Sequence, residues 1–283
     1  QSDGFDRSPT PPIELCILRV HMEDVKQNTL KEEKIRNFLK KKCDFEWHLS
    51  IHEEIESTND YLIEFSNPNE YSLCLAESQT KGKGRNLKKW QSPKYENIYM
   101  SLSFSTKHEL RNFSSFSLVS ALAVHNVLSK KSIFTEIKWP NDIYMNDKKI
   151  GGVLIETLTR DKKNLVIVGI GLNVFMENNS KIDQDWTSLK LEIENIIIDR
   201  NEIISEIANE VLLLKKKFEQ NGFDYFVNDY NKLNFLKDKK VSLLNSANEM
   251  GTALDINTDG SLNVKIDNQI KKVFSGEISI NIN

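Results

Sequence analysis

A lysine pair stands one residue before two glycines in the stretch KWPNDIYMNDKKIGGVLIE, which runs from Lys138 to Glu156. The Trp-Pro pair near its start favours an extended backbone and stops any helix, so the stretch should end a strand and turn at Asn141 and Asp142. Lys149 then enters the next strand beside the glycines, where missing side chains let a ligand lie against the sheet. A lysine placed there can neutralise a phosphate or a carboxylate in a transition state. An ordinary charged hairpin with glycine bulges would explain the same residues.

A second stretch, ESQTKGKGRNLKKWQSP from Glu77 to Pro93, combines glycines with five basic residues. The glycines let the backbone approach a ligand closely, and the cations can attract a carboxylate or a phosphate. Trp90 adds an aromatic face on which a base could stack. The polar segment 79–96 is predicted to be a long loop, and loops of that length are usually functional or mobile. A solvated basic loop without a ligand fits the composition equally well.

A third stretch, IVGIGLNV from Ile167 to Val174, alternates apolar residues and is predicted to be a buried strand. Gly169 and Gly171 fall on one face of this strand and leave a groove along the sheet, and Asn173 follows on that face. Tight packing against a helix would also explain the two glycines.

The order and spacing of these stretches resemble biotin protein ligases, the family that includes the bifunctional biotin operon repressors. KWPND followed by KKxGGxLxE is the strongest part of the resemblance. The matching stretches are ESTN at Glu56–Asn59, QTKGKGRNLKKWQSP at Gln79–Pro93, KWPNDIYMNDKKIGGVLIE at Lys138–Glu156, GIGLNV at Gly169–Val174 and GEISI at Gly276–Ile280.

The resemblance implies an ATP-dependent ligase with a two-step reaction. Biotin and MgATP give biotinyl-5′-adenylate and pyrophosphate, and a lysine of a biotin carboxyl carrier domain then attacks the mixed anhydride. In the first step two anions approach each other, so cations must offset their repulsion. The implied substrates are ATP with Mg²⁺ and biotin, and no metal site is expected from the protein alone. The implied partner is the biotin carboxyl carrier protein of acetyl-CoA carboxylase.

The resemblance also implies roles for single residues, with Lys149, Arg85 and Asp142 as the catalytic set. Asp142 would orient or deprotonate the incoming lysine. The implied biotin-binding residues are Ser57, Thr58, Asn59, Gln79, Gly82, Lys83, Arg85, Lys149, Gly152, Gly169 and Gly171. The implied ATP- and adenylate-binding residues are Lys83, Arg85, Trp90, Lys138, Asn141 and Asn173.

Two positions depart from the family loop, which commonly reads GRGRxGRxW. Lys83 replaces the first arginine of that pattern, and Leu87 replaces the later glycine. Lysine keeps the charge but loses the bidentate geometry of arginine, so a weaker hold on the adenylate is expected.

The composition of the chain argues against several other classes of function. The chain has 283 residues, 39% hydrophobic and 28% charged, with a net charge of −3, which gives no general reason to expect nucleic acid binding. Three widely spaced cysteines and five histidines show neither CxxC nor HxxH spacing, which favours a reducing, cytoplasmic setting without a zinc site. No apolar run approaches the roughly 20 residues that a membrane helix requires.

Hydrophobic periodicity places these motifs on a mixed α/β architecture. It predicts helices at Leu30–Lys42, from Ser57 or Thr58 to Phe65, at Phe113–Lys131, at Asn201–Asn221 and to about Leu236, with strands between them, among them Ile133–Trp139. Short strands with turn signals follow Leu236 and predict a small barrel. By resemblance, the fold is an α/β (α+β), class II synthetase-like catalytic domain with a mixed sheet flanked by helices, followed by an SH3-like barrel.

The expected domains are a disordered extension at 1–28, a catalytic domain at 29–236 and the SH3-like domain at 237–283. Native translation is expected to begin at Met22. One convincing helix precedes the catalytic motifs, so a monofunctional ligase without the helix-turn-helix domain of the repressors is expected, and no DNA or membrane partner. A homodimer is possible by analogy with the family. A lipoate protein ligase, whose RRxSGGG-type motif is absent, and a non-catalytic biotin-binding regulatory module stay open as alternatives.

Overall fold

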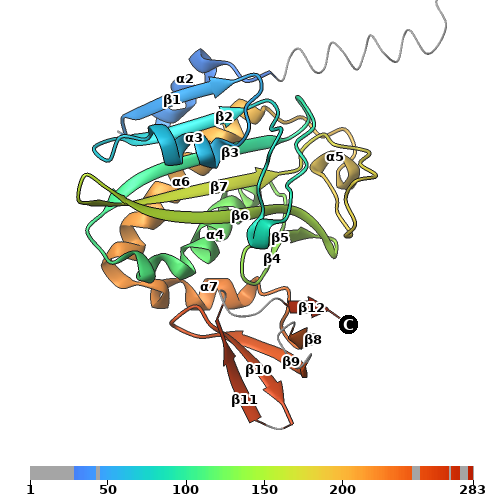
Figure 1. Cartoon of the computed structure of the whole chain (residues 1–283). Coiled ribbons are helices and arrows are strands. Elements are labelled where there is room, and N and C mark those ends of the chain that lie inside the picture. Colours follow the sequence, from blue (N-terminus) through green and yellow to red (C-terminus); the bar gives the residue numbers. More distant parts are fainter. Residues whose placement is uncertain (1–28, 43–44, 244–248, 268, 275–279, 283) are drawn as a thin grey trace, which may run out of the picture.

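A seven-stranded mixed sheet forms the centre of the protein, as the computed structural model shows (Figure 1). The structure describes residues 29–42, 45–243, 249–267, 269–274 and 280–282, so the proposed start at Met22 and nearly all of the GEISI stretch lie outside the described residues. The strand order is β1-β2-β3-β7-β6-β5-β4, with β1 and β2 parallel and the other neighbours antiparallel. The strands are β1 (Trp47–His52), β2 (Tyr71–Ala76), β3 (Ile98–Thr106), β4 (Glu136–Lys138), β5 (Asp142–Met145), β6 (Lys148–Arg160) and β7 (Lys163–Leu172).

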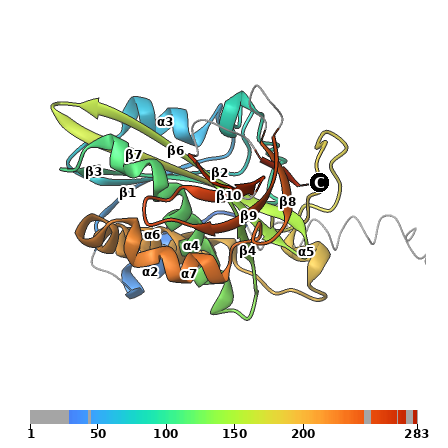
Figure 2. The same ribbon diagram turned by 90° about the horizontal axis from the view of Figure 1, so that it is seen from below.

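Three helices cover one face of this sheet, and a short helix lies on the other (Figures 1 and 2). The first group is α2 (Glu32–Lys42), α4 (Phe116–Ser129) and α6 (Arg200–Asn221), and the short helix is α3 (Thr58–Phe65). The main core lies between the sheet and the three helices. Helix α4 is apolar around most of its circumference and is buried along most of its length, as the sequence predicts.

Local signals define the ends of two of these helices. The Ser57 side chain accepts a hydrogen bond from the Asp60 amide and caps α3, so the predicted strand, cap and helix are confirmed. Helix α6 begins after the Asp199 cap and ends at Gly222, whose φ of 69° a side chain would disfavour. Shorter helical pieces are η1 (Arg85–Leu87), η2 (Leu110–Ser115), α5 (Leu189–Glu192), η3 (Phe223–Phe226) and α7 (Val227–Lys232).

Strand register brings the glycines of two strands together. In the antiparallel pair β6 and β7, Gly152 lies opposite Gly171, and on the other side of β7 Gly171 lies opposite Tyr99. Two neighbouring positions on the sheet therefore lack side chains, which leaves room above the sheet at this point.

A smaller sheet follows α7 and confirms the expected C-terminal β domain. Its order is β11-β10-β9-β8-β12, with β8 (Lys240–Leu243), β9 (Glu249–Ile256), β10 (Leu262–Ile266), β11 (Gln269–Val273) and β12 (Ile280–Ile282). It contacts the large sheet through the buried Trp139 indole, which donates to the Gly260 carbonyl at 3.0 Å. The segment that leads into the small sheet also pairs with Ile137. Strand β4 and the turn between β4 and β5 are thus held against the C-terminal part of the protein.

Three local features differ from what the sequence predicted or were not predicted by it. Strand β4 begins at Glu136, so Ile133–Thr135 precede it rather than belong to it. The segment 79–96 is not wholly irregular, because η1 interrupts it and Lys83 pairs with Lys89 in an isolated bridge. Helix α5 was not predicted, since a helix of one turn leaves no periodic pattern. None of the helices in the described part of the chain has the length and apolar character needed to cross a bilayer.

Candidate active site

The hairpin of β5 and β6 carries a lysine and an aspartate in direct contact. Asn146 and Asp147 form its tight turn with φ values of 49° and 61°, the left-handed conformation that two-residue hairpin loops need. The Lys149 ammonium lies 2.8 Å from Asp142 Oδ1, and the two side chains are only 14% and 20% exposed. The predicted hairpin is confirmed, and it presents a partly buried, oriented cation on the sheet surface.

Other cations gather near this pair. The Lys138 ammonium lies 3.3 Å from the Tyr144 hydroxyl. Burial lowers the pKa of Lys138; Asp142 raises it in part, and the nearby charge of Lys149 lowers it further. Mutual repulsion of this kind indicates positive potential that an anionic ligand would relieve.

Arg85 of the loop contacts the turn that precedes β5. Its guanidinium donates to Asn141 Oδ1 at 3.3 Å, and the Asn141 amide group donates to the Val153 carbonyl at 2.9 Å. Burial lowers the pKa of Arg85, and the charge of Asp142 opposes that shift. Two residues that are far apart in the sequence, Arg85 and Asn141, are therefore brought together beside the Lys149 and Asp142 pair.

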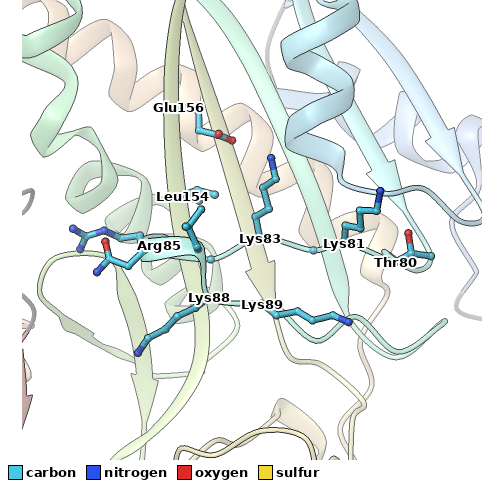
Figure 3. A pocket seen from close by; sticks show the side chains of 12 residues that line it. Thr80, Lys81, Lys83, Arg85, Lys88, Lys89, Leu154 and Glu156 are labelled. Atoms are coloured by element: carbon cyan, nitrogen blue, oxygen red, sulfur yellow. The ribbon is translucent and has the colours of Figure 1, made fainter.

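A pocket of about 650 Å³ opens between this loop and strand β6. Figure 3 shows Lys81 and Lys83 extending toward the side on which Glu156 lies, whereas Lys88 extends the other way. The pocket is lined by loop residues 80–89 together with Leu154 and Glu156. Its volume is in the range that holds a small-molecule ligand.

Lys83 lines the pocket, but its ammonium is engaged with another side chain of the protein. Its ammonium forms an ion pair with Asp60 on α3, and this hydrogen bond is the main cause that raises the pKa of Lys83. Glu156 accepts a hydrogen bond from the Asn59 amide at 2.7 Å. The lysine that replaces the expected arginine is thus attached to α3 in this structure.

The start of α3 carries a buried polar cluster. Gln79 Oε1 accepts from the Thr58 amide at 2.9 Å and from the Thr58 hydroxyl at 3.2 Å. The Ser101 hydroxyl lies 2.7 Å from that of Thr58 and donates to Asn59 Oδ1 at 2.5 Å. Three predicted biotin-binding residues are therefore in one network, and Ser101 is a member that the sequence analysis missed because nothing marks a serine within an apolar strand.

The glycine groove on β7 is covered by two side chains from other segments. A Cβ added to Gly169 would lie 2.9 Å from Asn59 Cγ, and one added to Gly171 would lie 2.6 Å from Trp90 Cζ2. The face predicted to make room for a ligand ring is therefore occupied by an amide and an indole. The Trp90 indole N–H is buried without a hydrogen-bond partner among the described residues, and the Lys149 ammonium lies 5.5 Å from the ring centre.

Asn173 is not open to the pocket. It is 4% exposed, and its amide group donates to the Thr187 carbonyl at 2.9 Å. The segment so held pairs with Lys149, which donates its amide N–H to the Asp185 carbonyl at 3.2 Å. This pairing puts Trp186 beside the catalytic hairpin, a second aromatic residue near the site that the sequence analysis missed.

Leu87 explains why a glycine is common at its position in the family loop. Its φ is 60°, in the left-handed region that glycine adopts without strain, and its side chain is fully exposed. The leucine adopts a glycine-type backbone conformation, so it strains the loop at this position.

Comparisons with known proteins agree with this geometry. Residues 51–173 match the model of the biotin/lipoate A/B protein ligase family. The bifunctional ligase/repressor BirA of Salmonella typhimurium is 32% identical over 233 residues, 80% of this chain and 72% of that protein. The biotin–[acetyl-CoA-carboxylase] ligase of Mycobacterium tuberculosis is 28% identical over 73% of this chain and 77% of its own length. The structure of a biotin protein ligase from Aquifex aeolicus in complex with biotin and ATP superposes with a TM-score of 0.72 at 30% identity, covering 83% of this chain and 99% of that one.

Proposed function

Because this chain belongs to the biotin/lipoate A/B protein ligase family, we propose that it activates biotin with ATP and transfers biotin to a lysine of an acceptor protein. Relatives named biotin–protein ligases, and a similar structure with biotin and ATP bound, support this assignment. Biotin protein ligases act on a biotin carboxyl carrier protein or other biotin-dependent carboxylases. The carrier protein of acetyl-CoA carboxylase is the proposed acceptor here, as the name of the Mycobacterium relative suggests.

One observation carries the residue roles: the 2.8 Å pair of Lys149 and Asp142 lies beside the contact of Arg85 with Asn141. In the first step a biotin carboxylate oxygen attacks the α-phosphorus, a new O–P bond forms, and the bond to pyrophosphate breaks. Two like charges about 4 Å apart repel by about 4 kcal/mol at the effective dielectric of a protein surface. Lys149 and Arg85 would offset that repulsion in the transition state.

In the second step the carrier lysine attacks the acyl carbon. A C–N bond forms, the C–O bond to AMP breaks, and the amine loses a proton. Asp142 is the proposed group that orients this amine or takes its proton. Its carboxylate forms an ion pair with Lys149. Contact of Lys149 with the phosphate would release the carboxylate for that role.

The polar network at the start of α3 is the proposed site for the ureido head of biotin. Thr58, Asn59 and Gln79 offer donors and acceptors in a buried setting, which a mostly apolar ligand needs for orientation. Trp90 is the proposed face for the adenine ring, and Trp186 is a second candidate because of its place beside Lys149. A bound ligand would have to move the Trp90 indole away from the groove over Gly171.

Magnesium is expected to enter with the nucleotide. No group of three or more histidine, cysteine, aspartate or glutamate side chains could hold a metal ion within the described ranges. Mg²⁺ in nucleotide enzymes commonly takes phosphate oxygens, waters and few protein ligands. It would supply charge neutralisation on the phosphates.

The test is biotin transfer to a recombinant biotin carboxyl carrier domain, measured as a gain in intact mass. The wild type should modify the carrier only when ATP is present, and Lys149→Ala should slow the reaction by at least about a hundredfold, since an electrostatic group of this kind contributes that much. Lys148→Ala is the matched control, because the neighbouring lysine contacts Glu192 at 3.5 Å instead of Asp142.

Other outcomes separate the alternatives. A gain in mass with lipoate on a lipoyl domain, and none with biotin, would assign the protein to the lipoate branch of the family. Binding of biotin without any ATP-dependent transfer would favour a regulatory module. Equal rates for Lys149→Ala and Lys148→Ala would refute the role given to Lys149.

A further inference from the structure

A buried ion pair lies behind the active-site loop, away from the residues that the proposed reaction uses. One guanidinium nitrogen of Arg200 lies 2.8 Å from Glu77 Oε2, and the two side chains are 0% and 6% exposed. The other carboxylate oxygen of Glu77 accepts from the Leu30 amide at 2.6 Å. The carboxylate is thus enclosed by the protein on both sides.

This pair joins the two ends of the loop. Glu77 begins the loop and Asn97 follows its end, and the second guanidinium nitrogen of Arg200 donates to the Asn97 carbonyl at 2.8 Å. The Tyr95 amide also donates to the Glu77 carbonyl at 3.1 Å. One planar guanidinium therefore spans both stems of the loop, a geometry for which arginine is suited and lysine is not.

The end of the loop that Arg200 contacts is also hydrogen-bonded to the segment after β7. Asn97 is 0% exposed, and its side-chain oxygen accepts from the Val174 amide at 2.9 Å. The Phe175 amide donates to the Glu96 carbonyl at 2.7 Å. This segment includes Asn173, which holds the segment around Trp186 that pairs with Lys149. A chain of hydrogen bonds outside the pocket therefore connects the end of the loop with the hairpin that carries Lys149.

Helix stability does not account for an arginine at this position. Arg200 is the first residue of α6, where the partial positive charge of the helix dipole repels a cation. Removing the two charges from water also costs free energy, which apolar residues of similar size would avoid. An arginine at this position is unfavourable for the helix. The contacts of Arg200 with the two loop stems therefore point to a role in the loop.

We propose that Arg200 and Glu77 are positioning residues that hold the two stems of the loop closed over the reaction intermediate. This proposal rests on the proposed function, because the intermediate is biotinyl-5′-adenylate. Loss of the bridge should let the loop open more often without displacing Lys149. The intermediate should then escape to water, while its formation changes less.

The first test is release of AMP by the full chain with biotin and ATP but without a carrier. Arg200→Met should raise this release by about tenfold, since a lost charge-assisted hydrogen bond shifts an opening equilibrium by that order. Arg200→Lys should give a smaller rise, because its ammonium keeps a charge opposite Glu77 although it cannot bridge both stems. The KM for biotin should rise more than kcat falls in a complete assay with carrier.

The double variant Glu77→Gln with Arg200→Met separates positioning from stability. It leaves no uncompensated buried charge and keeps an acceptor for the Leu30 amide, so its unfolding free energy should return toward that of the wild type. Its AMP release should stay high because the bridge to Asn97 is still missing. Recovery of tight retention in this variant would overturn the proposal.

Lys215→Met is the matched control. Lys215 lies on the same helix in a partly buried pair with Glu219 at 2.9 Å, with side chains 10% and 20% exposed. Its loss should lower stability without raising AMP release. Equal release from Lys215→Met and Arg200→Met would show that any destabilisation opens the loop, which would overturn the proposal.

Hydrogen–deuterium exchange of the ligand-free protein gives a readout independent of activity. Loop amides between residues 79 and 93 should exchange faster in Arg200→Met and in the double variant, and at the wild-type rate in Lys215→Met. Unchanged exchange would refute the positioning role. Absence of biotin transfer by the wild type would instead refute the proposed function. The exchange measurement would still test whether Arg200 positions the loop.

Discussion

Gly171 provides the sharpest steric test of the site, because Trp90 lies directly against it. A Cβ at Gly171 would lie 2.6 Å from Cζ2 and 2.7 Å from Nε1 of the indole, against 3.4 Å or more in an ordinary contact. The backbone of Gly171 is that of a regular strand, so alanine fits the main chain and only the Cβ disturbs its surroundings. The indole must therefore move by most of an ångström or leave the groove.

Gly171→Ala should expel the indole, because the loop that carries Trp90 can move more easily than the sheet. Overpacking typically costs about 1–3 kcal/mol, and we expect the low end, about 1 kcal/mol, where the crowded ring can swing out. Gly152→Ala is the matched control in the same groove, since its Cβ would meet Trp90 Cζ3 at an ordinary 3.6 Å.

The assay is acrylamide quenching of tryptophan fluorescence in the ligand-free protein, with urea unfolding in parallel. The chain has four tryptophans, so each variant is compared with its Trp90→Phe counterpart to isolate the Trp90 signal. Gly171→Ala should make Trp90 more accessible to acrylamide and red-shift its emission, whereas Gly152→Ala should not. If both variants leave the Trp90 signal unchanged, or if both expose the ring equally, the close packing of indole on glycine described above is wrong.

Three further predictions concern stability. Ser57→Ala removes the cap that accepts from the Asp60 amide, so urea unfolding should show a loss of about 0.5–2 kcal/mol, and Ser57→Asn, which keeps an acceptor, should show little loss. Leu87→Gly relieves a left-handed backbone without losing burial, so the loop should resist limited proteolysis better, and faster cleavage would contradict the strain assigned to Leu87. Burial lowers the pKa of His125 below 6.5, although the contact with Thr135 raises it in part. As the pH drops, the unfolded chain therefore binds this proton before the folded protein does. The unfolding free energy should consequently fall as the pH drops below 6.5. His125→Gln should flatten that pH dependence, and an unchanged slope would assign it to other groups.

Local patterns in the sequence were sufficient for much of the architecture. A serine ahead of an apolar helix predicted the Ser57 cap, and NDKK predicted the hairpin that carries Lys149. Gly222 predicted the end of α6. Each signal acts over a few neighbouring residues, where backbone sterics and single hydrogen bonds decide the conformation.

The sequence by itself determined which chemical groups the site contains, since motif spacing placed Arg85 on a loop and Lys149 beside glycines on a strand. Only the tertiary structure decided which groups meet. Strand register places Gly152 opposite Gly171, and the loop packs so that the Trp90 indole covers the space left by these glycines.

The same holds for the contacts that support the site. The pairing of Trp186 with Lys149 and the bridge of Arg200 between the loop stems join residues far apart in the chain. No local pattern encodes such contacts, because their partners are selected by the packing of the whole sheet against its helices. The chemistry of this protein can be predicted from its sequence, whereas the arrangement that holds its loop in place depends on the complete fold.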